Sequence, residues 1–124
     1  MKKDWEIIRA VLLELESAPR ANTNLGPKHL PQYPEQEVAY NLRLLDEAGY
    51  IKGKFVDSSD GDGRIAAAIA TRLTNEGHEL LDTIRNDNVW TKLKETFRSK
   101  GLDMTFELAI EVGKTVIKSF LGLQ

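Results

Sequence analysis

The sequence predicts a mainly α-helical protein with one small β-hairpin, and three observations carry this prediction. Residues 36–48 place apolar side chains at helical spacing, and Gly49 follows where a left-handed turn can end a helix. Two strand-like runs come next, at 51–56 and 64–73. The segment 57–63 between them is rich in aspartate and glycine, as a hairpin loop requires. A helix followed by a hairpin is the layout of a winged helix, so we expect a winged-helix-like domain with further helices after it.

Length and composition restrict the class of protein. The chain has 124 residues, of which 41% are hydrophobic and 29% charged, as is ordinary for a globular protein. It has no cysteine, which excludes disulfides and thiolate metal sites. No apolar run approaches the ~18 residues of a membrane span, and Asp4 and Glu6 interrupt any signal-peptide core. We therefore expect a cytoplasmic protein that does not enter a membrane.

The charge is distributed unevenly along the chain. The formal net charge is −2. Residues 34–77, which include the predicted helix and hairpin, contain five basic and eight acidic residues. Because nucleic-acid binding depends mainly on Lys and Arg at phosphates, this excess of acid counts against DNA binding.

The first helix is expected over residues 4–17, with Asp4 as its cap, and Pro19 prevents its continuation. The following segment, 18–34, contains all four prolines of the protein and has no helical periodicity. A complete helix-turn-helix would place another helix there. Its absence is the main departure from a standard winged helix, and the length of the segment suggests a function or a short strand.

The helix at 36–48 has two different faces. Val38, Leu42 and Leu45 share the inner face, and the opposite arc holds four outward candidates: Gln36, Tyr40, Arg43 and Glu47. The run 64–73 is harder to interpret, because its four alanines favour a helix. Ile65, Ile69, Thr71 and Leu73 nevertheless fall on one face at period two, which favours a strand.

Three more helices are expected after the hairpin. Thr74 caps the first, residues 86–88 separate it from a second that ends at Gly101, and the last covers 103–121. The apolar arc of this last helix is about twice the ~100° that one core needs. We therefore expect a two-fold homodimer, whose contact residues would be Phe106, Ala109, Ile110, Gly113, Val116, Ile117 and Phe120. The expected division is a winged-helix-like domain, 1–86, and a C-terminal helical extension, 87–124, packed on the same core.

Several short motifs together resemble a known family. They are Asp4-Trp5 with Ile7-Ile8, the run Val38 to Leu42, the run Ala48 to Ile51, the run Leu73 to His78, and the run Asp87 to Trp90. This set is similar to the bacterial and phage proteins of domain of unknown function 2513. Asn41 and Asn75 depart from the family, which often has His and Trp there. The resemblance implies a fold but no chemistry.

A looser similarity concerns the winged-helix repressors of the MarR and PadR kinds. It depends on the helix that runs into Ala48-Gly49-Tyr50-Ile51 and on the Thr74-x-x-Gly77 run after a hairpin. In those repressors, residues before the glycine lie on the recognition helix. This is an analogy of fold and gives only a modest expectation of function.

The sequence contains little that indicates a catalytic or metal-binding site. His29 and His78 have no partner at zinc-ligand spacing. A calcium loop counted from Asp57 or Asp60 reaches Ala68 or Thr71 at its twelfth position, where a glutamate is required. No lysine follows the glycines as in a P-loop. We therefore expect no enzyme, no metal and no cofactor.

Two hypotheses of function remain. The first is a dimeric transcriptional regulator that inserts the 36–48 helix into double-stranded DNA. Its contacts would be Gln36, Tyr40 and Arg43 to bases, and Lys52, Lys54 and Arg64 to phosphates. The alternative is a non-enzymatic interaction module of bacterial or phage origin that presents an acidic winged face to a protein partner. The layout favours the first hypothesis and the acidity favours the second, and the sequence on balance predicts the DNA-binding regulator.

Overall fold

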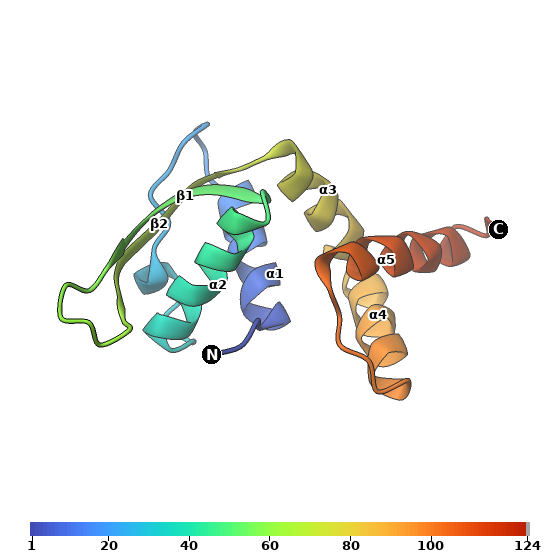
Figure 1. Cartoon of the computed structure of the whole chain (residues 1–124). Coiled ribbons are helices and arrows are strands. Elements are labelled where there is room, and N and C mark those ends of the chain that lie inside the picture. Colours follow the sequence, from blue (N-terminus) through green and yellow to red (C-terminus); the bar gives the residue numbers. More distant parts are fainter. Residues whose placement is uncertain (124) are drawn as a thin grey trace. The chain divides into compact units, whose positions relative to one another are not determined.

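The computed structural model describes residues 1–123 and consists of two compact units, Met1–His78 and Glu79–Gln124. Five α-helices and one two-stranded antiparallel hairpin lie in the described part of the chain (Figure 1). The prediction of a mainly α-helical protein with a small hairpin is confirmed. Within residues 1–123 no helix has the length and apolar character needed to cross a membrane.

The first unit is built on two helices, α1 (Trp5–Glu16) and α2 (Glu35–Glu47). Asp4 caps α1, because its side chain accepts hydrogen bonds from the amides of Glu6 and Ile7. The buried residues are those that the helical spacing predicts, among them Ile8 and Leu12 on α1. Asn41 on α2 is also fully buried, and its amide oxygen accepts a hydrogen bond from the backbone of Asp4 (2.8 Å). This bond joins the start of α1 to the middle of α2.

The hairpin follows α2 directly. Gly49 has a φ of +85°, so it ends the helix in the left-handed conformation that glycine adopts without strain. Strands β1 (Ile51–Asp57) and β2 (Ile65–Leu73) then pair antiparallel. Of the predicted run 64–73, residues 65–73 therefore form a strand despite their four alanines, because pairing with β1 outweighs intrinsic helix propensity.

The prediction for the inner face of β2 was wrong in part. Ile65 and Leu73 are buried, but Ile69 is 37% exposed, and the alanines at 68 and 70 are buried in its place. The cause is two irregularities in the ladder, between Lys52 and Gly53 and between Val56 and Asp57. Each bulge adds one residue to β2, so the side chains between the bulges change faces relative to a regular strand.

The proline-rich segment 18–34 contributes a short edge to the sheet. Leu25 forms an antiparallel bridge with Ala70, and both backbone hydrogen bonds of the pair are made, at 2.9 and 2.8 Å. The chain then turns through the 3₁₀ helix η1 (Pro27–His29) into α2. The suggested short strand is therefore a single bridge, and a 3₁₀ turn occupies the position of the missing helix.

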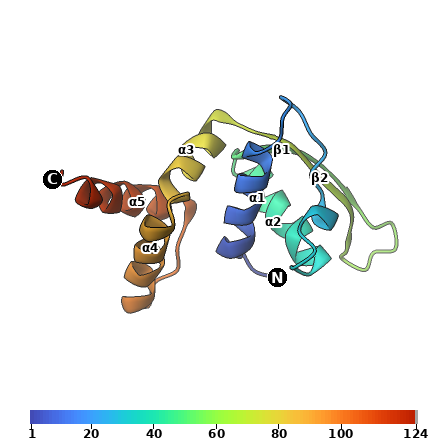
Figure 2. The same ribbon diagram turned by 180° about the vertical axis from the view of Figure 1, so that it is seen from behind.

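The remaining helices are α3 (Asn75–Ile84), α4 (Asp87–Ser99) and α5 (Phe106–Phe120), labelled also in the reverse view of Figure 2. Helix α3 begins in the first unit and ends in the second. Asn86 caps α4, and α4 packs against α5. The last helix starts three residues later than predicted, because the side chain of Thr105 accepts the amide of Leu108 and sets the start at Phe106.

Candidate interaction site on α2 and the hairpin

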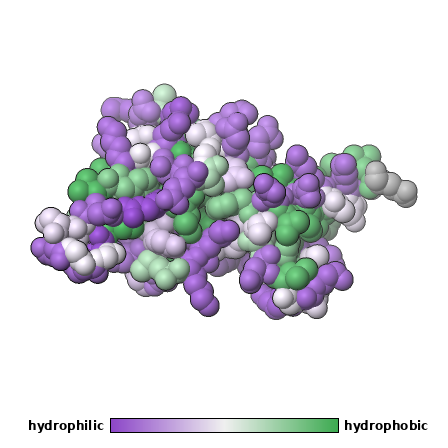
Figure 3. All heavy atoms as spheres, in the orientation of Figure 1, coloured by the Kyte–Doolittle hydropathy of each residue, from purple (hydrophilic) through white to green (hydrophobic). Residues whose placement is uncertain are grey.

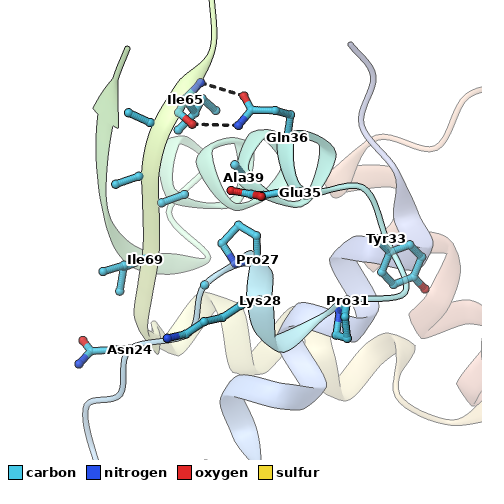
Figure 4. A pocket seen from close by; sticks show the side chains of 14 residues that line it. Asn24, Pro27, Lys28, Pro31, Tyr33, Glu35, Gln36, Ala39, Ile65 and Ile69 are labelled. Atoms are coloured by element: carbon cyan, nitrogen blue, oxygen red, sulfur yellow. Dashed lines mark hydrogen bonds between the residues drawn. The ribbon is translucent and has the colours of Figure 1, made fainter. Parts of the chain in front are cut away.

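Gln36 of α2 holds the hairpin instead of projecting freely. Its side-chain nitrogen donates to the carbonyl of Ile65, and its side-chain oxygen accepts the Ile65 amide, both at 2.9 Å (Figure 4). An amide side chain offers one donor end and one acceptor end in the same spacing as a peptide group. Gln36 therefore pairs with β2 as a strand residue would, and this amide is not available to a base edge in this arrangement.

Arg43 is also engaged with the hairpin. Its guanidinium donates to the Asp57 carboxylate at 2.5 Å and lies 5.7 Å from the centre of the Phe55 ring. The Arg43 side chain is 28% exposed and the Asp57 side chain 72% exposed, so solvent screens the pair. The two contacts direct the guanidinium toward β1.

The hairpin therefore covers one flank of α2 and leaves a different arc accessible. This arc contains the half-exposed residues Glu37, Tyr40 and Leu44 and the exposed Glu47. We call these four residues the α2 arc. Two of them are acidic, two are largely apolar and none is basic. Of the predicted base-contacting residues, only Tyr40 belongs to it.

The predicted phosphate contacts divide between two places. Lys52 and Lys54 alternate along β1 and are exposed, whereas Arg64 is exposed at the end of the hairpin loop. The register pairs Lys52 with Arg72, so these two basic residues share the outer face of the hairpin with Lys54. Arg72 was not among the predicted phosphate contacts, because its position opposite Lys52 depends on the register of the two strands.

The loop between the strands carries two aspartates, Asp60 and Asp62, and Asp57 ends the strand before it. Asp62 accepts a hydrogen bond from the backbone amide of Arg64 at 3.0 Å, and this bond is the main reason why the pKa of its carboxyl lies below the ordinary value. Across residues 1–123, no three His, Cys, Asp or Glu side chains come together in a way that would hold a metal ion. His29 has a structural contact, because its Nδ1 accepts the amide of Gly26 at 3.1 Å.

A groove of about 600 Å³ lies beside β2 in the first unit. One wall is the strand itself from Ile65 to Ile69, and the opposite wall comes from η1 and the start of α2 (Figure 4). Pro27, Pro31 and Tyr33 line this second wall, and Lys28 and Glu35 are its charged side chains. No sequence motif predicts this groove, because its two walls come from segments that are far apart in the chain, residues 24–39 and 65–69.

The residues predicted for a dimer contact on α5 separate into two groups. Ala109, Gly113 and Val116 are buried within their own protomer, and a Cβ at Gly113 would lie 2.3 Å from the Thr83 methyl carbon. These three are not available for a contact between copies. The other four are half-exposed or exposed: Phe106, Ile110, Ile117 and Phe120. Apolar side chains are visible over α5 and over the hairpin in Figure 3.

Comparison with known proteins identifies a family whose members this chain resembles. The profile of the family described as "Hypothetical protein (DUF2513)" matches residues 2–103. A protein of Haemophilus influenzae named "Uncharacterized protein" is 40% identical over 122 residues, which are 98% of this chain and 100% of that protein. No solved structure matches. The match extends from the start of α1 through α4, and the chain belongs to the DUF2513 family.

Proposed function

We propose that this protein is a non-enzymatic interaction module whose α2 arc binds a protein partner with a basic surface. The proposal rests on one observation: the α2 arc contains Glu37 and Glu47, while Arg43, the one basic residue of α2, is directed toward Asp57 and Phe55 of the hairpin. A DNA groove would repel such an arc, because each phosphate adds negative charge. Tyr40 and Leu44 between the two carboxylates supply the apolar contact area that protein interfaces use.

The negative charge of the hairpin loop is also complementary to a partner with a basic surface. Asp60 and Asp62 are exposed, and the carboxyl of Asp62 keeps its charge to a lower pH than usual because its pKa is lowered. Complementary charges mainly raise the rate of association and select the partner. We therefore expect binding that weakens with salt and that depends on the acidic side chains of the arc.

Photo-cross-linking in bacterial cells tests this proposal. Tyr40 is replaced by p-benzoylphenylalanine, and the adduct formed on irradiation is treated separately with protease and with nuclease. We expect a protein adduct that is lost when Glu37→Lys and Glu47→Lys are added. It should persist with the control pair Glu14→Lys and Glu95→Lys, two exposed positions outside the arc. A nuclease-sensitive adduct, or no adduct, would refute the proposal.

DNA binding by a winged-helix-like regulator is the second candidate, and the basic outer face of the hairpin is the observation that favours it. Lys52, Lys54 and Arg72 lie on one face, where they would contact phosphates. A labelled random duplex titrated with salt tests this candidate. Three phosphate contacts should give a slope of about −3 in log affinity against log salt. Absence of binding at low salt would exclude it.

We also propose that the protein acts in the bacterial cytoplasm as a homodimer joined through α5. The support is the apolar surface that α5 keeps, which includes Ile110, Ile117 and the 59% exposed Phe120. A groove of about 390 Å³ between α4 and α5 lies beside Phe120 and would accept side chains of a second copy.

A further inference from the structure

The tip of the hairpin contains two consecutive Asp-Gly pairs, Asp60-Gly61 and Asp62-Gly63, and all four residues are exposed. An aspartate side chain reacts most readily with the main chain when glycine follows it, because glycine has no side chain to hinder the approach to its amide nitrogen. The sequence has no other Asp-Gly pair and no Asn-Gly pair. The two pairs at the tip differ in their hydrogen bonds.

The carboxylate of Asp62 is held in place. Its Oδ1 accepts the backbone amide of Arg64 at 3.0 Å, and the Ser58 hydroxyl also hydrogen-bonds to this carboxylate. The bond to the Arg64 amide is the larger cause of the lowered pKa of the Asp62 carboxyl, because it favours the ionised form. Reaction with the amide of Gly63 would require this carboxyl to take up a proton and to give up the bond to Arg64.

The carboxylate of Asp60 has no such restraint. Within residues 1–123 it makes no hydrogen bond and no ion pair, and only the backbone amide of Asp60 is engaged, with the Ser58 hydroxyl oxygen at 3.3 Å. In the described part of the chain the amide of Gly61 donates to no acceptor. Both groups that would react with each other are therefore unengaged.

The residue before the loop, Asp57, shows the opposite case. Its carboxylate accepts a hydrogen bond from the Arg43 guanidinium, and the amide of the following Ser58 donates to the Arg64 carbonyl at 2.9 Å. Both reacting groups are occupied there. Of the three aspartates at this end of the hairpin, only Asp60 combines an unengaged carboxylate with an unengaged amide in the next residue.

We propose that Asp60 is a modification site, at which the fold directs the spontaneous formation of isoaspartate to Asp60 and withholds it from Asp62. The nitrogen of Gly61 attacks Cγ of the protonated Asp60 carboxyl, and the carboxyl hydroxyl leaves with the amide proton as water. The product is a five-membered succinimide. Water then opens the ring at either carbonyl carbon, and opening at the former main-chain carbonyl gives isoaspartate. The water lost in the first step returns in the second, so no oxidant or other reactant is needed.

The modification changes the main chain of the tip. Its product has the same charge and composition as aspartate, but the chain now runs through Cγ and the carboxylate is attached directly to Cα. One methylene group is added to the main chain between Ser58 and Arg64, which are joined by the hydrogen bond described above. This site is separate from the α2 arc and does not rest on the proposed function.

Incubation of the folded protein in warm, mildly acidic buffer is the first test. Mass spectrometry with electron-transfer fragmentation distinguishes isoaspartate at Asp60 from isoaspartate at Asp62. We expect at least ~10-fold more at Asp60, because reaction at Asp62 must first break a hydrogen bond to an ionised carboxylate. Equal amounts at the two positions, or an excess at Asp62, would overturn the proposal.

The same chain in guanidinium chloride supplies the control. Unfolding removes the bond between Asp62 and Arg64, so the two Asp-Gly pairs should then react at rates within about two-fold of each other. Isoaspartate at Asp60 in the unfolded chain but not in the folded protein would show that the fold protects this residue, and the proposal would fail.

Two matched variants test the route of the reaction. Gly61 and Gly63 both have a positive φ, and a Cβ would lie in open space at either position, so the two alanine substitutions strain the loop similarly. Gly61→Ala should remove most of the isoaspartate at Asp60, whereas Gly63→Ala should leave it unchanged. Equal isoaspartate at Asp60 in both variants would overturn the succinimide route. None of these results bears on the cross-link from Tyr40, so the two proposals can fail independently.

Discussion

Replacing Gln36 by leucine should release β2 from α2. The variant keeps the volume and the methylene packing of the side chain but removes both hydrogen bonds to Ile65. A neutral hydrogen bond contributes roughly 1 kcal/mol net, and water can reach this half-exposed site, so we expect a loss of about 1–2 kcal/mol in unfolding free energy. The adjacent Gln32→Leu variant is the control, since Gln32 is exposed and outside this contact.

Urea denaturation measures the global loss, and hydrogen exchange locates it. In Gln36→Leu the Ile65 amide should exchange at least ~10-fold faster, by more than the change at the buried Leu42. The variant Gln36→Glu should be intermediate, because a carboxylate accepts the Ile65 amide but cannot donate to its carbonyl. If Gln36→Leu were as stable as Gln32→Leu and left Ile65 exchange unchanged, the amide would not be holding the strand.

Three further substitutions test the packing and the proposed dimer. Gly77→Ala should destabilise the first unit by ~3 kcal/mol in urea denaturation, because a Cβ there would lie 2.0 Å from the carbonyl oxygen of Tyr50. Gly113→Ala should cost roughly 1–3 kcal/mol through its contact with the Thr83 methyl group, and adding Thr83→Ser should recover most of this loss. Ile117→Asp should convert a dimer into a folded monomer in size-exclusion chromatography with light scattering.

Controls for these substitutions come from neighbouring positions. Lys114→Asp also adds negative charge to α5 but at an exposed position, so its oligomeric state should not change. Thr83→Ser alone keeps the hydroxyl that donates to the Glu79 carbonyl at 2.9 Å and should cost little. If Thr83→Ser did not restore stability to Gly113→Ala, the contact with the Thr83 methyl group would not be the cause of the loss. If the Ile117→Asp variant remained a dimer, the interface would lie elsewhere.

The sequence predicts the order of the elements because their boundaries depend on local chemistry. A few adjacent residues determine each boundary. Asp4 caps α1, Gly49 ends α2 in the left-handed conformation, and the Thr74 hydroxyl accepts the Gly77 amide at the start of α3. These boundaries were predicted correctly. The start of α5 was missed by three residues, because Asp103 and Thr105 are both acceptable caps and the sequence does not choose between them.

The candidate site depends on contacts that local chemistry does not encode. Gln36 and Ile65 are 29 residues apart, and nothing in the helical pattern shows that an outward glutamine is paired with a strand edge. The same holds for Arg43 with Asp57, 14 residues away. The exposed position of Ile69 follows from two bulges, and a period-two pattern assumes that there are none. The local sequence pattern therefore does not show how β1 and β2 are aligned or which distant residues contact each other.

The two bulges have a consequence for how this hairpin tolerates changes in length. Strand β1 has seven residues and β2 has nine, and the surplus consists of one residue at each irregularity. Deleting Thr71 alone would remove the surplus residue of one bulge and leave Arg72 and Ala70 opposite Lys52 and Gly53, so Ala68 and Ala70 would still face the core. Deleting Ile69, which lies between the two irregularities, would instead turn part of the strand over and carry buried alanines to the outer face. Loss of a surplus residue should thus be less damaging than loss of one residue between the bulges.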